Sequence, residues 1–214
     1  MTTTTREPVA FRDAARNVNE AGTGLTPGQW GMVAFLLSEV ALFSTLIVAY
    51  LIFAGRDSLP GGLGGPTPLG VLSLRLVIGT TLCLLASSAT VHLAERALRR
   101  GSDGVFLGLW LLTIALGIVF LLGTAYEWRD LIFTHRLTIS RNLFGTTFYT
   151  LVGLHALHVT AGVVVMLIVL VMALRRHLTE KNRDGVELVS WYWHYVDVVW
   201  VVVFTVVYAL PHLS

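Results

Sequence analysis

The sequence contains few charged residues and a single cysteine. Asp, Glu, Lys and Arg make up 13% of its 214 residues, whereas a soluble domain has about 25%. Hydrophobic residues make up 55% and the mean hydropathy is +0.72, so most of the chain has no aqueous surface to cover. Cys83 lies within an apolar run, which excludes an internal disulfide and indicates a small packing residue. The net charge of +2 is too small to indicate a nucleic-acid partner.

An apolar stretch is also absent from the first 25 residues, so we expect no cleavable signal peptide. Five later segments reach the length of about 20 apolar residues that crosses a membrane. The predicted fold class is an all-α integral membrane protein, a bundle of five transmembrane helices. We expect a polar N-terminal arm over residues 1–28 and one transmembrane domain over 29–214, with helices at about 29–54, 68–98, 105–128, 144–174 and 190–210.

The distribution of Arg and Lys predicts the orientation of these helices. Ten of the 15 basic residues lie in the N-terminal arm and in the second and fourth connections, which share one side of the membrane. Four lie in the connections of the opposite side, and Arg75 lies inside the second helix. Because basic residues are enriched in cytoplasmic loops, we expect a cytoplasmic N-terminus and an external C-terminus.

Proline is absent between Pro68 and Pro211, so nothing breaks the predicted helices after the first connection. Transporters commonly combine inverted repeats with Gly- or Pro-broken helices around a midplane site, and neither feature is present. The glycine-rich run GGLGG lies between prolines and follows no strand, which is typical of a turn and not of a phosphate-binding loop. We therefore favour an accessory subunit over a transporter, and we expect no metal site and no catalytic residue on this chain.

Ionisable residues inside the predicted helices are the informative positions, because each costs roughly 2.5–3.5 kcal/mol at the centre of a membrane. Three pairs are spaced i, i+3 and so share a helix face: His92/Glu95, His155/His158 and His194/Asp197. Either these pairs join helices by hydrogen bonds, worth about 0.6–2 kcal/mol each, or they serve a function. Glu127 lies near the predicted end of the third helix, and the aromatic residues Trp191 and Trp193 flank the last pair.

Glu39 lies about ten residues into the first helix, near the membrane midplane, with no basic residue within one turn. Three interpretations are open: a hydrogen bond to a neighbouring helix, a proton-relay site, or a polar anchor for a lipid. A b-type cytochrome anchor is a further alternative, because geometry leaves room for one bis-histidine haem, for instance between His92 and His158.

Four stretches resemble subunit III of the haem–copper cytochrome c oxidases. They are GMVAFLLSEVALF around Glu39, GTAYEWRDL at 123–131, FGTTFYTLVGLHALHVTAGVVV at 144–165 and WYWHYVDVVW at 191–200. The resemblance runs in order from Trp30 to Leu210 and so covers nearly the whole membrane part.

The resemblance implies a non-catalytic subunit of an enzyme that passes electrons to oxygen and pumps protons. Such a subunit packs against oxidase subunits I and II, which hold haem and copper, and itself carries no redox cofactor. It binds structural phospholipid and supports proton uptake. The residues that fall on the family's buried polar or lipid-binding positions are Glu39, His92, Glu95, Glu127, His155, His158, Arg175 and Arg176, whereas Trp191, Trp193, His194 and Asp197 are expected to pack helices together.

Longer members of this family have two more helices before the glutamate helix, and residues 1–28 are too polar to form them. We expect a further small subunit to close the lipid cleft in their place. The short five-helix form implies a bacterial cytoplasmic (inner) membrane. It also occurs in quinol oxidases and in relatives associated with nitric oxide reductase, so the electron donor, cytochrome c or quinol, stays open.

Overall fold

The computed structural model describes residues 24–53, 74–175 and 180–213, with single positions at 56, 64 and 72; of 180–183 and 212–213 it describes the backbone alone. The expected arm therefore lies almost wholly outside the described residues. The described part folds into helices and contains no strand. Its five long helices are α2 (Pro27–Phe53), α4 (Leu74–Arg99), α5 (Asp103–Phe133), α6 (Leu143–Leu174) and α7 (Glu180–Phe204).

All five helices are long and apolar enough to cross a membrane, which confirms the predicted fold class. Two of them extend beyond their expected ends. α5 continues to Phe133, not Trp128, and α7 begins at Glu180, not Ser190. The physical reason is that apolarity marks only the stretch inside lipid, whereas helical hydrogen bonding continues into water.

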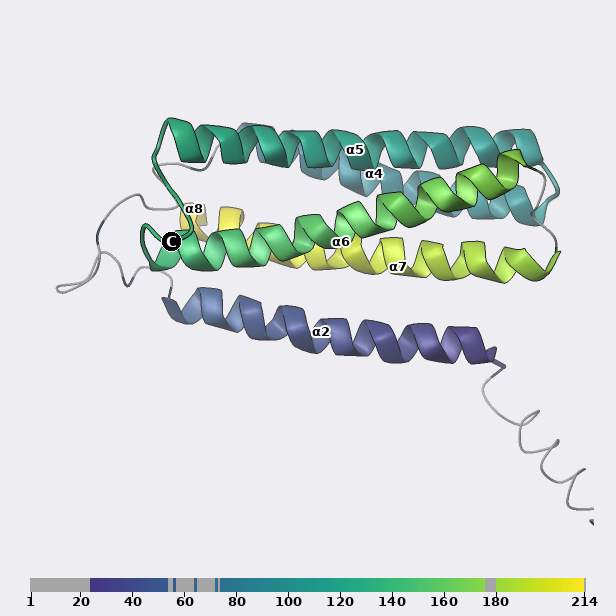
Figure 1. Ribbon diagram of the computed structural model, residues 1–214, viewed down its shortest axis with the longest axis horizontal. Coiled ribbons are helices and arrows are strands. Elements are labelled where there is room, and N and C mark those ends of the chain that lie inside the picture. Colours follow the sequence, from purple (N-terminus) through teal and green to yellow (C-terminus); the bar gives the residue numbers. More distant parts are fainter. Residues whose placement is uncertain are drawn as a thin grey trace, which may run out of the picture.

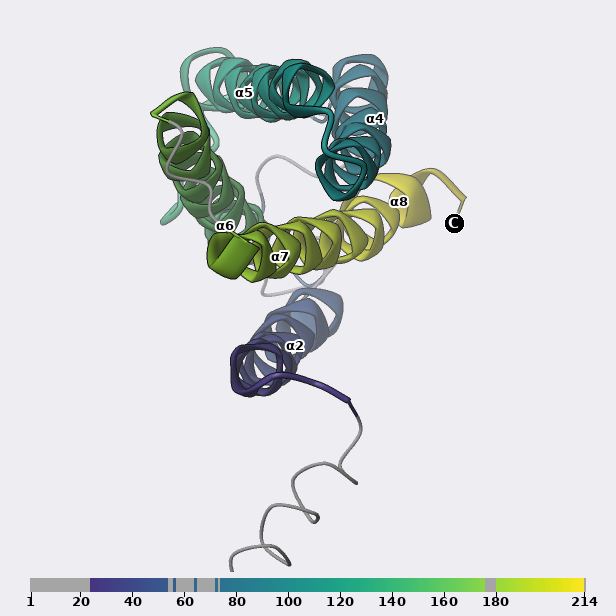
Figure 2. The same cartoon turned by 90° about the vertical axis from the view of Figure 1, so that its right-hand side faces the viewer.

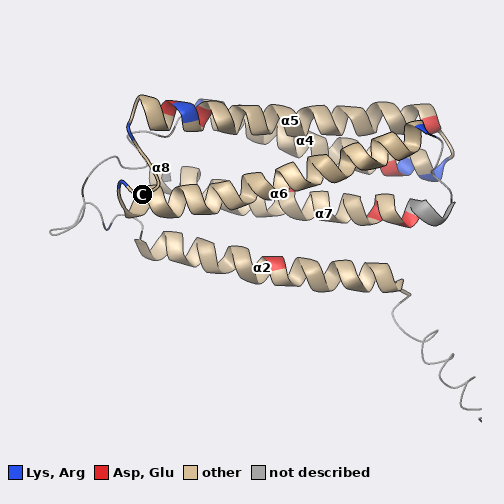
Figure 3. Ribbon diagram, in the orientation of Figure 1, with Lys and Arg blue, Asp and Glu red and all other residues tan. Residues whose placement is uncertain are grey.

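Helices α4, α5, α6 and α7 form a four-helix bundle, and α2 lies outside it against α6 and α7 (Figures 1 and 2). Successive helices run antiparallel, so the start of α2, the end of α4 and the start of α7 share one end of the molecule (Figure 1). Charged residues gather towards the two ends, and one acidic residue lies in the middle of α2 (Figure 3). It is Glu39, because α2 contains no other Asp, Glu, Lys or Arg.

Trp193 occupies the centre of the bundle and is completely buried. A Cβ atom at Gly117 of α5 or at Gly162 of α6 would lie 2.8 Å from the Trp193 indole, so both positions need glycine. The indole Nε1–H donates a hydrogen bond of 2.9 Å to Ser87 Oγ of α4. One side chain of α7 therefore fixes the approach of the three other helices.

Local sequence explains where several helices begin. Thr26 and Gln29 form a reciprocal cap at the start of α2: Thr26 N–H donates to Gln29 Oε1 (2.8 Å) and Gln29 N–H donates to Thr26 Oγ1 (3.3 Å). Pro27, between them, suits the first helical position. Asn142 caps α6 by accepting from Gly145 N–H at 2.8 Å.

The end of α7 widens into one π-helical turn, η2 (Thr205–Ala209), followed by the short helix α8 (Leu210–Leu213). Pro211 has no N–H for the preceding turn, which accounts for the irregular hydrogen bonding at this point. The turn places Tyr208 inside the protein, where it is completely buried.

Candidate functional site

Glu39 of α2 and His158 of α6 are in direct contact. Glu39 Oε2 lies 3.0 Å from His158 Nε2, and the two side chains are 15% and 14% exposed. His158 Nδ1 lies 2.8 Å from the carbonyl oxygen of Leu154, one turn earlier on α6. Tyr192 of α7 donates a hydrogen bond of 2.9 Å to the backbone carbonyl of His158. Three helices therefore meet at this pair.

The contact between Glu39 and His158 requires a proton. Because a carbonyl oxygen only accepts, His158 Nδ1 must carry the hydrogen that it donates to Leu154. Nε2 then either accepts from a protonated Glu39 or, in an imidazolium, donates to a carboxylate. In either form the two side chains together carry no net charge, which suits a site among apolar helices.

An apolar groove lies one to two turns from this pair, towards the start of α2. Its volume is about 280 Å³. The phenyl ring of Phe35 lies 6.2 Å from the ring of Tyr192, centroid to centroid, across the groove. The groove is lined by Met32 and Phe35 of α2, Ala161 and Val165 of α6, and Val189 and Tyr192 of α7.

His155, one turn before His158, lies inside the bundle and is completely buried. Its ring stacks on Trp200 at a centroid distance of 4.8 Å and meets Phe120 edge-on at 5.8 Å. Within the described part, neither ring nitrogen has a hydrogen-bond partner. The two histidines of α6 thus lie in different surroundings.

Glu127 of α5 is 5% exposed and accepts a hydrogen bond of 2.9 Å from the Tyr208 hydroxyl. Its second oxygen, Oε1, has no hydrogen-bond partner among the described residues. The π-helical turn directs Tyr208 into the protein, so its hydroxyl can reach Glu127. The pair joins α5 to the end of the α7–η2 segment.

His194 and Asp197 lie further along their helix than expected. The predicted helix at about 190–210 would hold them in its first two turns, but α7 begins at Glu180, so His194 follows after nearly four turns and Asp197 after nearly five. The predicted start of this helix is therefore wrong. Asp197 is 3% exposed, whereas His194 is half-buried and its Nδ1 lies 2.7 Å from Ser88 Oγ of α4. Trp191 is half-buried, and Trp193 occupies the bundle centre.

His92 and Glu95 lie along the boundary of α4 with α7 and not in the bundle core. His92 is exposed and its ring lies 6.4 Å from that of His194. Glu95 pairs with Arg99 on its own helix, and Arg99 also reaches Glu187 of α7 at 3.5 Å.

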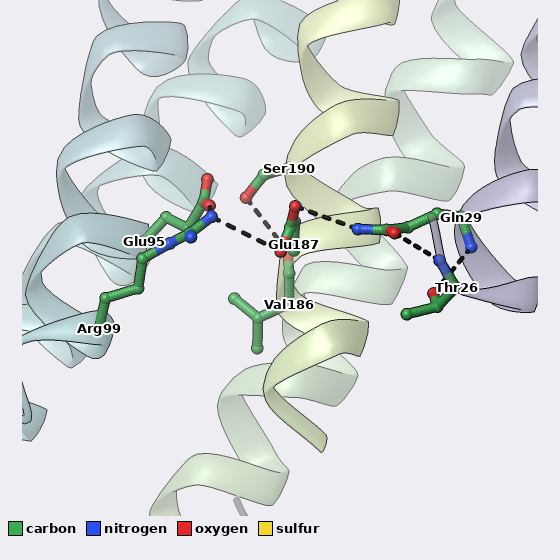
Figure 4. A network of polar contacts seen from close by, with 7 residues as sticks. All are labelled: Thr26, Gln29, Glu95, Arg99, Val186, Glu187 and Ser190. Atoms are coloured by element: carbon green, nitrogen blue, oxygen red, sulfur yellow. Dashed lines mark hydrogen bonds and ion pairs between the residues drawn. The ribbon is translucent and has the colours of Figure 1, made fainter. Parts of the chain in front are cut away.

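Gln29 completes a polar network at this end of the molecule. Its Nε2 donates a hydrogen bond of 3.4 Å to Glu187 Oε1, so α4, α7 and the start of α2 are tied together (Figure 4). Arg175 is exposed and follows the last residue of α6, where a cation complements the helix dipole. Arg176 lies outside the described residues.

The pairing of His92 with His158 around one haem does not fit this arrangement. His158 faces Glu39 of α2, whereas His92 lies beside His194 at the boundary of α4 and α7. The two imidazoles that would have to coordinate one iron from opposite sides therefore face different helices. Among the described residues no three His, Cys, Asp or Glu side chains come together as a metal site.

Comparison with known proteins identifies the family. A family model described as cytochrome c oxidase subunit III matches residues 10–211. The chain belongs to the cytochrome c oxidase subunit III family. Subunit III of this kind is a component of a haem–copper oxidase complex, so the chain is a multi-pass membrane subunit that associates with other oxidase subunits.

Three relatives illustrate the breadth of the match. A cytochrome c oxidase subunit 3 of Synechocystis sp. is 39% identical, over 85% of this chain and 75% of the relative. A probable cytochrome c oxidase subunit 3 of Mycobacterium tuberculosis is 35% identical, over 83% of this chain and 85% of the relative. A cytochrome bo(3) ubiquinol oxidase subunit 3 of Pseudomonas aeruginosa is 32% identical, over 92% and 90%.

Several residues that complete these contacts were not identified from the sequence. Tyr208, Tyr192 and Ser88 are ordinary residues of apolar helices, and only the packing brings them to Glu127, His158 and His194. Of the three, only Ser88 could have been found from the sequence, because it lies one turn before His92 on the same helix face.

Proposed function

We propose that this subunit III holds a structural phospholipid in the groove between α2, α6 and α7, and so supports proton uptake by the catalytic subunit. The observation that carries the proposal is the apolar groove of about 280 Å³ next to Glu39 and His158. Val165 lines the groove, and Arg175 follows ten residues later, about 15 Å along α6. An acyl chain in the groove would thus place its phosphate near the Arg175 guanidinium.

The proposal extends to the wider assembly by analogy with the family. The proposal places haem and copper in partner subunits I and II and no redox cofactor on this chain. It places the N-terminus on the cytoplasmic side of a bacterial inner membrane, in keeping with the distribution of Arg and Lys.

A further small subunit is proposed to cover α2. The support is the exposure of large apolar side chains along this helix, whose main contacts among the described helices are with α6 and α7. Leu37 and Val48 are 64% and 53% exposed.

Filling the groove tests lipid binding. Val165→Phe introduces a ring into the groove, and Val164→Phe introduces the same ring at a neighbouring exposed position that does not line it. Lipids retained by the purified oxidase are counted by native mass spectrometry. We expect the Val165 variant to lose one phospholipid and to inactivate sooner during turnover, while the Val164 variant behaves like the parent. Equal lipid retention in both variants would overturn the proposal.

We propose cytochrome c as the electron donor, because the names of most of the similar relatives include cytochrome c oxidase. The second candidate is quinol, favoured by the match to a ubiquinol oxidase subunit over 90% of that relative. Oxygen uptake by the purified complex with reduced cytochrome c and with reduced quinol distinguishes them.

A further inference from the structure

Polar residues line the boundary between α4 and α7 from one end of the molecule to the middle of the bundle. On α4 they are Arg99, Glu95, His92 and Ser88, spaced by three or four residues, so they share one helix face. On α7 they are Glu187, His194 and Asp197. Because the two helices run antiparallel, the two sets face each other in register, and we call them together the polar seam.

Side-chain contacts between α4 and α7 connect the successive residues of the polar seam. At the outer end Arg99 lies 3.5 Å from Glu187, and both side chains are accessible (Figure 4). Further in, the rings of His92 and His194 lie 6.4 Å apart, centroid to centroid. His194 Nδ1 then lies 2.7 Å from Ser88 Oγ, and Ser88 also faces the carboxyl group of Asp197.

The inner end of the polar seam is a buried acid with unfilled hydrogen-bonding capacity. Asp197 is 3% exposed, and neither carboxyl oxygen makes a well-formed hydrogen bond within the described part of the chain. A buried carboxyl group in this situation needs a proton, a water molecule or both. The distance between the His92 and His194 rings is likewise one that a water molecule can bridge.

Other titratable groups near α7 face elsewhere. Glu39 of α2 and His158 of α6 contact each other, and Glu127 of α5 binds Tyr208. His155 of α6 stacks on Trp200. From α4, Ser88 faces the Asp197 carboxyl group, with His92 and Glu95 further along the same face.

The polar seam closes beyond Asp197. One turn further along α7, Trp200 donates a hydrogen bond of 2.9 Å to Thr81 of α4, and both residues are buried. Trp193 and Ser87 close the side towards the bundle centre in the same way. The seam is therefore blind at its inner end, and it opens at the Arg99 end and along its outer edge, where His92 is exposed.

We propose that the polar seam is a hydrated, blind proton path, through which Asp197 exchanges a proton with the aqueous face beside Arg99. Water at Ser88, His194 and His92 completes the hydrogen bonds, and each imidazole can accept a proton on one nitrogen while it releases one from the other. Asp197 is the proton-binding site at the inner end. This role is independent of phospholipid binding in the groove, because the groove lies between other faces of the helices.

Cysteine accessibility in the whole oxidase complex tests whether the seam is hydrated. In a Cys83→Ser background, Ser88→Cys places a thiol in the seam. Ala89→Cys places one at the next residue, on the exposed side of α4 and closer to the aqueous end. Because a water-soluble methanethiosulfonate reacts with the thiolate, which forms in water and not in hydrocarbon, we expect S88C to react about tenfold faster than A89C. Equal rates, or no reaction at S88C, would overturn the proposal.

Infrared spectroscopy of the same complex tests the proton site itself. We expect a carboxylic C=O band that is lost in Asp197→Asn and that shifts rapidly after transfer to D2O. In His194→Phe the band should remain and the shift should slow by about tenfold, since the ring that relays the proton is gone; His194→Gln, which keeps a polar group, provides a second variant. Absence of an Asp197 band, or equal exchange in all variants, would show a packing role only and overturn the proposal.

Discussion

Glu39 and His158, 119 positions apart in the sequence, are joined by a contact of 3.0 Å between Oε2 and Nε2. The contact joins α2 to the bundle near the middle of the helix, while Gln29 and Glu187 join it at one end. These two polar contacts add to the apolar packing of α2, in which Phe43 and Tyr50 are buried.

Removing either member of this pair should loosen α2. We expect Glu39→Leu and His158→Leu each to lower the stability of subunit III in the membrane by about 1–2 kcal/mol, the upper part of the range for hydrogen bonds between helices. Glu39→Gln can still donate to Nε2 and should cost less. The stability loss of the double Leu variant should be smaller than the sum of the two single losses. The stability of all four variants is measured by titrating the complex with denaturant and following release of subunit III. Simple additivity would contradict the contact. Ser38→Ala, at an exposed hydroxyl that bonds only to its own helix, is the control.

The close packing of the Trp193 indole against Gly162 gives a second prediction. Gly162→Ala places a methyl group where the indole already lies, so we expect a loss of about 1–3 kcal/mol in stability from overpacking. Gly108→Ala is the matched control, because nothing lies within 4 Å of a Cβ atom there. Trp193→Phe should partly rescue Gly162→Ala, since the phenyl ring lacks the outer indole atoms. Thermal denaturation of the complex measures each variant, and equal losses at Gly108 and Gly162 would refute this packing.

The hydrogen bond between Tyr208 and Glu127 gives a third prediction. Tyr208→Phe removes the donor and leaves a buried carboxyl group with neither oxygen bonded among the described residues, so we expect a loss of about 1–3 kcal/mol. Glu127→Gln keeps an acceptor oxygen for the phenol and should cost less. The comparison is made by urea or detergent denaturation of the purified complex. A Tyr208→Phe variant as stable as the parent would show that the contact contributes nothing.

The amino-acid sequence predicts the helices because each needs a long apolar run, and a run of that kind is visible without knowledge of its neighbours. Buried ionisable residues such as Glu39 and Glu127 are visible for the same reason, since charge is rare inside lipid. Their partners are not predictable. Which residue faces Glu39 depends on how far α2 and α6 are rotated and shifted, and no local pattern encodes this.

The packing of α7 likewise could not be predicted from the sequence. That Trp193 is buried follows from its apolar surroundings, but its position between Gly117 and Gly162 depends on three helices at once. The start of α7 at Glu180 was missed because residues 180–189 are largely polar, and apolarity says nothing about a helix that continues into water. That error placed Asp197 in the first two turns of its helix, whereas it follows after nearly five turns and is buried.

A fourth prediction concerns the chemical accessibility of the two buried glutamates. A hydrophobic carbodiimide reaches its target through the membrane and reacts with a carboxyl group that carries a proton. Glu39 lies at the edge of the bundle with its side chain 15% exposed, whereas Glu127 is 5% exposed and lies between helices. We therefore expect Glu39 to be labelled several times faster than Glu127, as measured by mass spectrometry of peptides from the treated complex. His158→Leu should change the labelling rate of Glu39 and leave that of Glu127 unaltered, because of the two only Glu39 contacts the imidazole. Labelling of Glu127 with none at Glu39 would show that the α2 carboxyl group is shielded, and would contradict its position at the edge of the bundle.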